Sequence, residues 1–134
     1  MKNLTQYLEE VQINSGIRRI EIALSTLYNI NDLLIQIRED PDRSIETKSR
    51  EDKNALKRQF SYIRDNLLSA ASFFNIQEYS GKIIKGKIAE VVDSSIALLN
   101  ELLSDYNDGV DDHITWGKTS MDIASTMTEI ARKI

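Results

Sequence analysis

The densest group of possible metal ligands in this chain is the acidic loop from Asp105 to His113, DYNDGVDDH. Carboxylate oxygens spaced along a loop that contains a glycine are the ligands that calcium prefers. In an EF-hand loop the glycine stands at the sixth position and a bidentate glutamate at the twelfth. Counted from Asp105, however, Gly109 is the fifth residue and Trp116 is the twelfth. We therefore interpret the segment as an acidic connection between two helices and predict no metal site.

The residues that other common catalytic and metal-binding sites require are also missing from the sequence. His113 is the only histidine, and there is no cysteine. A di-metal site in a helix bundle takes a Glu-x-x-His motif from each of two helices, so one histidine cannot complete it. The chain contains neither a Gly-x-x-x-x-Gly-Lys phosphate loop nor a Gly-x-Ser-x-Gly nucleophile motif. We expect a protein that is not an enzyme and that needs no cofactor.

Basic side chains are the remaining candidates for recognising another molecule. Local groups of this kind are most often ordinary solvated charges on a helix. If they converge on one surface, they form an electrostatic docking patch for an acidic partner. Among the aromatic residues, Tyr62 is a candidate for exposure, and Trp116 is expected in the core. The candidate docking residues are Arg18, Arg19, Lys57, Arg58, Arg64, Lys82, Lys85 and Lys87.

Composition narrows the class of protein. The 134 residues carry a net charge of −4, with 41% hydrophobic and 28% charged residues. This balance is typical of one soluble globular domain, and it argues against nucleic acid, which needs a basic face. No run approaches the roughly 20 apolar residues of a membrane span. Only one proline and five glycines interrupt the chain, which favours long helices.

Helices must position these side chains, and residues 49–74 form the clearest one. Apolar side chains recur there in steps of three and four, which places them on one helical face. Ser49 followed by Asp52 has the spacing of a helix N-cap. The apolar positions are Leu56, Phe60, Ile63, Leu67, Ala70 and Phe74.

The same period predicts further helices over about 3–13, 17–38, 82–106 and 112–134. Residues 14–16 either break the helix or lie within one continuous helix that is locally less stable. Residues 41–48 are predicted to form a polar connection. Gly109 suits a left-handed helix end, and Asp111 or Asp112 is expected to cap the last helix. Short connections make neighbouring helices antiparallel. We expect one all-α domain over 1–134, an up-down-up-down four-helix bundle with a short helical N-terminal lead-in.

Four pieces of the chain are similar to a known family. They are LYNI (27–30), REDKNALK (50–57), IRDNLLSAA (63–71) and IALLNELL (96–103). In order and spacing they resemble the PsbQ family, the small extrinsic subunits on the lumenal side of photosystem II. The chain lacks the long proline-rich N-terminal arm of plant members, and residues 111–134 follow the matching part. It is therefore more similar to the divergent PsbQ-type subunits of diatoms and red algae.

The resemblance implies a non-catalytic subunit of the chloroplast thylakoid lumen. Such a subunit docks on the photosystem II core and on other extrinsic subunits, and is peripheral to the membrane through these protein contacts. It helps the oxygen-evolving complex to retain calcium and chloride without ligating the metal. No site residue of the family can be carried over, because the matching positions pack helices.

The alternative hypothesis is a soluble helical adaptor or regulatory module, for example cytoplasmic and bacterial, that binds a protein partner in a groove of the bundle. The two hypotheses differ at the N-terminus. The first implies a longer precursor with a transit sequence, of which Met1 is an added start. The second implies a native start at Met1.

Overall fold

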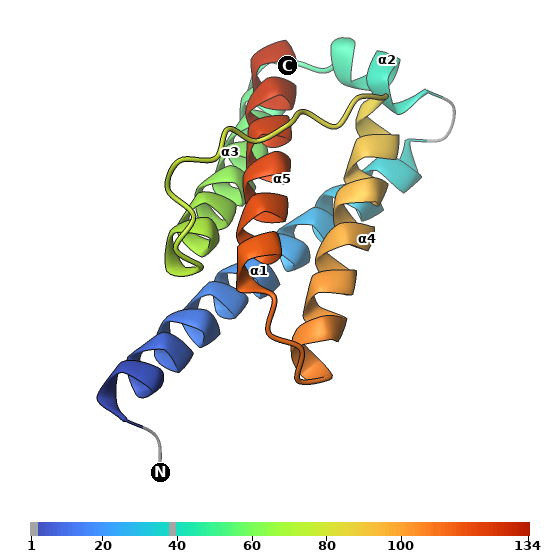
Figure 1. Cartoon of the computed structure of the whole chain (residues 1–134). Helices are drawn as coiled ribbons and strands as arrows, with labels where there is room; N and C mark the ends of the chain where they lie inside the picture. Colours follow the sequence, from blue (N-terminus) through green and yellow to red (C-terminus); the bar gives the residue numbers. More distant parts are fainter. Residues whose placement is uncertain (1–2, 38–39) are drawn as a thin grey trace.

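The computed structural model describes residues 3–37 and 40–134. All regular elements in these ranges are α-helices, which confirms the all-α class (Figure 1). Their bounds are α1 Leu4–Gln36, α2 Pro41–Glu46, α3 Arg50–Phe73, α4 Ile88–Asn107 and α5 His113–Lys133.

α1 is one continuous helix, so of the two alternatives for residues 14–16 the continuous helix is confirmed, and no separate helix over about 3–13 forms. The residues at 14–16 do not break it: the Ser15 hydroxyl donates to the Val11 carbonyl (2.9 Å) within the helix. Gly16 is buried because the helix passes close to α3 there. A Cβ on Gly16 would lie 2.5–3.0 Å from ring atoms of Phe74. The glycine therefore serves a close helix contact rather than a turn. The predicted end at Arg38 lies outside the described residues.

α3 matches its prediction closely. The Ser49 hydroxyl accepts a hydrogen bond from the Asp52 amide (3.2 Å), which caps the helix as expected. All six apolar positions of its predicted face are buried. The α3 helix packs against α1 on one side and α5 on the other, so its apolar face fills the centre of the bundle.

The connection at 41–48 contains the short helix α2, which the sequence analysis did not predict. Pro41 stands at its first turn, where the missing N–H costs nothing. Ile45 is buried and ties the helix to the core. The Asp42 carboxylate accepts the amide hydrogen of Ile88, with oxygen distances of 3.1 and 3.2 Å. α2 thereby holds the first residue of α4.

The predicted helix over 82–106 begins only at Ile88. Residues 75–87 instead form an extended segment, which we call the crossover, along the outside of α5. The Lys82 amide donates to Asp122 (2.6 Å) and the Ile84 amide to the Thr126 hydroxyl (2.9 Å). These bonds to α5 replace the hydrogen bonds that a helix would have made. Helix formation resumes after Gly86, whose φ is +144°.

The crossover changes the topology. The crossover runs along α5 from Gly117, which contacts Ile76, to Thr126, which bonds to Ile84. It thereby returns the chain to the end of the bundle where α3 began. α4 then runs parallel to α3, and the order is up, down, down, up (Figure 1). The expected up-down-up-down order is therefore not confirmed. It assumed short connections throughout, whereas the crossover spans the length of α5.

An aromatic cluster closes the opposite end of the core. Trp116 is 3% exposed, as expected, and meets Phe74 edge-on with ring centroids 5.9 Å apart. Tyr106 meets it similarly at 6.1 Å, and its hydroxyl donates to the Asn14 side chain. Side chains from α1, α4 and α5 and from the end of α3 thus come together at this end through Trp116 and Tyr106. Beyond it the N-terminal turns of α1 project from the bundle (Figure 1).

Candidate functional site

Three of the predicted docking residues lie around one exposed aromatic ring. Tyr62 on α3 is 52% exposed. It lines a shallow depression with Arg18 of α1 and another with Lys57 and Arg58 of its own helix. We call these four residues the α1–α3 basic face. An exposed ring flanked by cations offers both apolar contact area and charge to an acidic partner.

Arg19 and Arg64 lie near this face but already have partners. The Arg19 guanidinium donates to the Asn66 side-chain oxygen (3.4 Å), and the Asn66 amide donates to the Tyr62 carbonyl (3.0 Å). Arg64 makes an ion pair with Asp65 at 2.9 Å. Both arginines therefore stabilise contacts within the bundle in addition to placing positive charge near this face.

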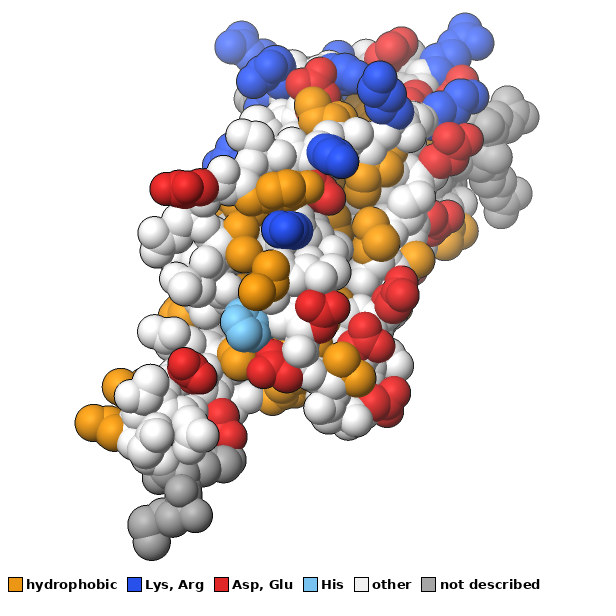
Figure 2. All heavy atoms as spheres, viewed as in Figure 1, with side chains coloured by type: hydrophobic (Ala, Val, Ile, Leu, Met, Phe, Trp, Pro, Cys, Tyr) orange, Lys and Arg blue, Asp and Glu red, His pale blue; other side chains and the backbone are white. Residues whose placement is uncertain are grey.

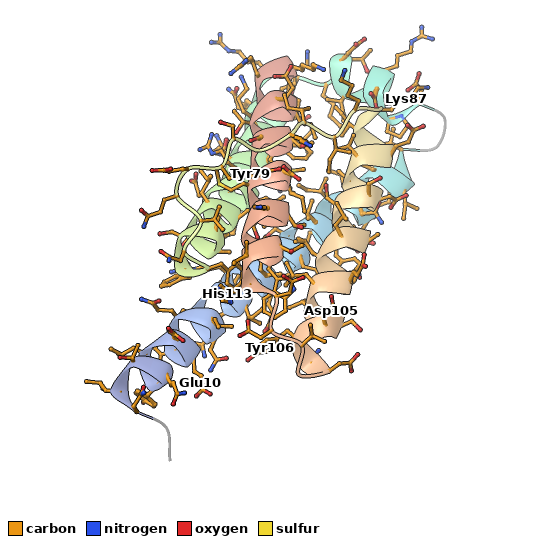
Figure 3. All side chains as sticks on the ribbon, in the orientation of Figure 1. Glu10, Tyr79, Lys87, Asp105, Tyr106 and His113 are labelled. Carbon is orange, nitrogen blue, oxygen red and sulfur yellow. The ribbon has the colours of Figure 1, made fainter. Side chains whose placement is uncertain are left out.

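The other three predicted residues, Lys82, Lys85 and Lys87, lie on the crossover instead. The backbone amide of Lys82 contacts α5 through Asp122. Lys87 directly precedes α4 (Figure 3). The eight candidate docking residues therefore lie on different segments, and whether any of them binds a partner stays a prediction. The fold divides them between the α1–α3 basic face and the crossover.

Charge is also divided along the bundle. Residues 88–117 carry seven Asp or Glu and no Lys or Arg. Lys and Arg gather at the end of the bundle where α2 and the C-terminus lie (Figure 2). The start of α3, the start of α4 and the end of α5 meet there. This gives the described surface a basic end and an acidic side.

The basic end contains a cavity of about 590 Å³ that the sequence analysis missed. We call it the terminal cavity. α2, the start of α3, the crossover, the start of α4 and the end of α5 line it. Isoleucines come from every one of these segments except α3. The charged lining residues are Lys53, Lys85 and Lys133 together with Asp42, Glu46 and Glu129. No local pattern could have revealed it, because its lining residues come together only through the crossover.

The acidic loop behaves as a helix connection. Gly109 has a left-handed φ of +81°, as expected, and the Val110 amide donates to the Asp105 carbonyl (2.9 Å). The expected side-chain cap is absent: Asp112 precedes α5 but makes no capping hydrogen bond. The Asp111 carboxylate instead contacts Nδ1 of His113 at 2.8 Å. Figure 3 shows His113 at the start of α5. Within residues 3–37 and 40–134, no three His, Cys, Asp or Glu side chains form a metal-binding group.

One tyrosine on the crossover has a shifted pKa. The Tyr79 hydroxyl donates to the Asp122 carboxylate at 2.9 Å. This hydrogen bond, together with partial desolvation and the negative charge of Asp122, raises the pKa of Tyr79 above its ordinary value. The pair fastens the crossover to α5. Lys118 lies 5.9 Å from the centre of the same ring.

None of the helices in the described ranges combines the length and apolarity needed to cross a membrane. No protein-family model matches the chain, and no curated protein or solved structure matches it.

Proposed function

We propose that this chain is a non-catalytic extrinsic subunit that docks on the lumenal side of photosystem II. Its task would be to support calcium and chloride retention by the oxygen-evolving complex. The proposal starts from the PsbQ resemblance, two of whose pieces, 50–57 and 63–71, belong to α3. The observation that carries it is the α1–α3 basic face, because Lys57 lies within one of these pieces and Tyr62 lies between them.

The chemistry of this face suits an acidic protein surface. Tyrosine and arginine are the residues that most often dominate binding energy at protein interfaces. Lys57 and Arg58 have no ion-pair partner among the described residues, so their charges remain available. Charge of this kind speeds association and makes binding sensitive to salt. This agrees with a subunit that is held peripherally and released by high ionic strength.

Reconstitution tests the proposal. Photosystem II membranes from an alga are stripped of extrinsic subunits with salt, and the chain is added back at low ionic strength. We expect it to sediment with the membranes and to restore oxygen evolution at low calcium or chloride. Failure to rebind at low ionic strength would refute the proposal.

Variants then test the docking face. Tyr62→Ala should weaken rebinding by about tenfold or more, since such anchors contribute about 2 kcal/mol. The double variant Lys57→Gln/Arg58→Gln should weaken rebinding at low salt even more than Tyr62→Ala does. A matched double variant, Lys118→Gln/Arg132→Gln, removes the same charge from α5. Equal losses in the two double variants would show that net charge, and not this face, governs docking.

A second candidate function is the helical adaptor, favoured by a different surface. Four apolar side chains on the projecting turns of α1 are exposed, and their spacing places them on one side of the helix. A partner with a hydrophobic groove could bind such a row. The native precursor distinguishes the two functions: a transit sequence before this chain supports the first, and a bacterial start at Met1 supports the second. The exposed residues are Leu4, Tyr7, Leu8 and Val11.

A further inference from the structure

The terminal cavity has an apolar interior with stiff walls. Its volume of about 590 Å³ lies within the range of about 300–1,000 Å³ that is usual for small-molecule sites. The walls are almost all β-branched, and such side chains have few rotamers with which to collapse into the space. α4 and α5 touch each other little, which leaves this space between their ends. The apolar walls are Ile45, Ile84, Ile88, Val91, Ile130 and Ile134.

Two of the polar side chains that line the cavity, Thr126 and Asp42, already have partners. The Thr126 hydroxyl accepts from the Ile84 amide and donates to the Asp122 carbonyl (2.8 Å). Asp42 is bound to the amide of Ile88 at the start of α4, where the helix dipole also offsets its charge. The interior therefore offers an occupant apolar contact and few free hydrogen-bonding groups.

Charged side chains of both signs also line the cavity. Besides Asp42 and Glu129, which have partners, the lining contains the carboxylate of Glu46 and the two lysines Lys53 and Lys85. Lys53 and Lys85 have no ion-pair partner among the described residues. Glu129 is shared between Arg132 (3.6 Å) and Lys133 (3.8 Å), so two cations surround one carboxylate there. Two lysines with flexible stems thus remain for an anionic group.

One apolar side chain of the lining is also uncovered. Ile83 lines the cavity yet is 48% exposed. It lies next to Ile84 and close to Lys85 in the sequence, and all three residues line the cavity. Apolar walls with two unpaired lysines in the same lining match a molecule that joins an apolar chain to an anionic group.

We propose that the terminal cavity binds a medium-chain fatty acid. Its alkyl chain lies among the isoleucines, and its carboxylate reaches Lys53 and Lys85. The two lysines select the anionic head group, and the volume and walls select a single alkyl chain. This site is distinct from the α1–α3 basic face, so it does not depend on the proposed docking function.

Calorimetric titration of the whole chain with octanoate and decanoate, below micelle-forming concentrations, tests the chain length. Each methylene that enters the cavity should tighten binding by about fourfold. Decyltrimethylammonium, with the same chain and a cationic head, should bind at least tenfold more weakly than decanoate. Equal binding of the two decyl compounds, or no saturable binding of decanoate, would overturn the proposal.

Lysine variants test the head group. Lys53→Gln/Lys85→Gln should weaken decanoate binding at least tenfold and leave the binding of decanol unchanged. Lys57→Gln/Lys118→Gln removes the same charge outside the cavity and should change neither. If both double variants lose decanoate binding equally, Lys53 and Lys85 do not select the carboxylate.

Isoleucine methyl signals in NMR spectra locate the bound molecule without any substitution. Decanoate should shift the methyl signals of Ile84, Ile88 and Ile130. The methyl signals of Ile35 and Ile114, which are exposed on other surfaces, should stay in place. Shifts of similar size at all five would show non-specific adsorption, and would contradict a site in the terminal cavity.

Discussion

Replacing Gly81 with alanine tests whether the crossover runs along α5. A Cβ on Gly81 would press into the backbone carbonyl of Met121, and would lie 2.6 Å from the Ser125 hydroxyl oxygen. The hydroxyl can rotate away, but the carbonyl belongs to the α5 helix and is fixed by it. Gly81→Ala must therefore lift this part of the crossover from α5.

The cost of that displacement follows from the bonds that break. Tyr79, Lys82 and Ile84 donate three hydrogen bonds to side chains of α5. Each contributes about 0.5–1.5 kcal/mol to stability. Alanine also restricts the unfolded chain, which favours the variant by about 0.4–1 kcal/mol. We expect Gly81→Ala to lower the free energy of unfolding by about 2 kcal/mol.

Urea unfolding, followed by far-ultraviolet circular dichroism, measures the loss. Ser80→Ala is the matched control, because it changes the exposed neighbour in the same segment and should leave stability within about 0.5 kcal/mol. The slope of free energy against urea should be unchanged in both variants, since the surface exposed on unfolding is similar. If the two variants unfold at the same urea concentration, the crossover does not pack on α5, and the parallel arrangement of α3 and α4 loses its support.

Two further predictions concern the core and the tyrosine on the crossover. Phe60→Ala should lower the free energy of unfolding in urea by about 3–5 kcal/mol, because Phe60 is fully buried. Leu68→Ala, at an exposed position of the same helix, should lower it little. Equal effects of the two substitutions would show that the buried face of α3 is misassigned. Tyr79 should ionise at higher pH than an unperturbed tyrosine, so its contribution to stability is present below about pH 10 and is lost as pH rises through its folded pKa. Ultraviolet absorbance should show this late titration, and Asp122→Asn should return it toward the ordinary range; an unchanged titration in that variant would exclude the carboxylate as the cause.

Local signals were sufficient for α3. Its apolar period and its Ser49 cap involve residues within a few turns of one another, so the prediction over 49–74 agrees with the helix Arg50–Phe73. The left-handed end at Gly109 was equally local. Gly16 shows where local reasoning becomes ambiguous. The same residue can break a helix or allow close packing, and only the position of Phe74 decides between them.

The start of α4 could not be read from its own residues. Ile84 and Ile88 continue the helical period, yet the Ile84 amide bonds to Thr126, which lies 42 residues away. A partner so distant in sequence is invisible to periodicity. The terminal cavity was hidden for the same reason, because the segments that line it meet only after the crossover has returned the chain to the basic end.

For the candidate docking residues, too, the sequence determined one part of the answer and the tertiary structure the other. The sequence alone determined an all-helical chain, the buried face of α3 and the identity of the basic residues, because periodicity and charge are properties of short segments. Which of those basic residues share a surface was decided only by the tertiary structure. The crossover carries Lys82, Lys85 and Lys87 along α5, whereas Lys57 and Arg58 lie beside Tyr62. The physical reason is that hydrogen bonds between the crossover and α5 replace helical ones, and these contacts set the direction in which α4 runs.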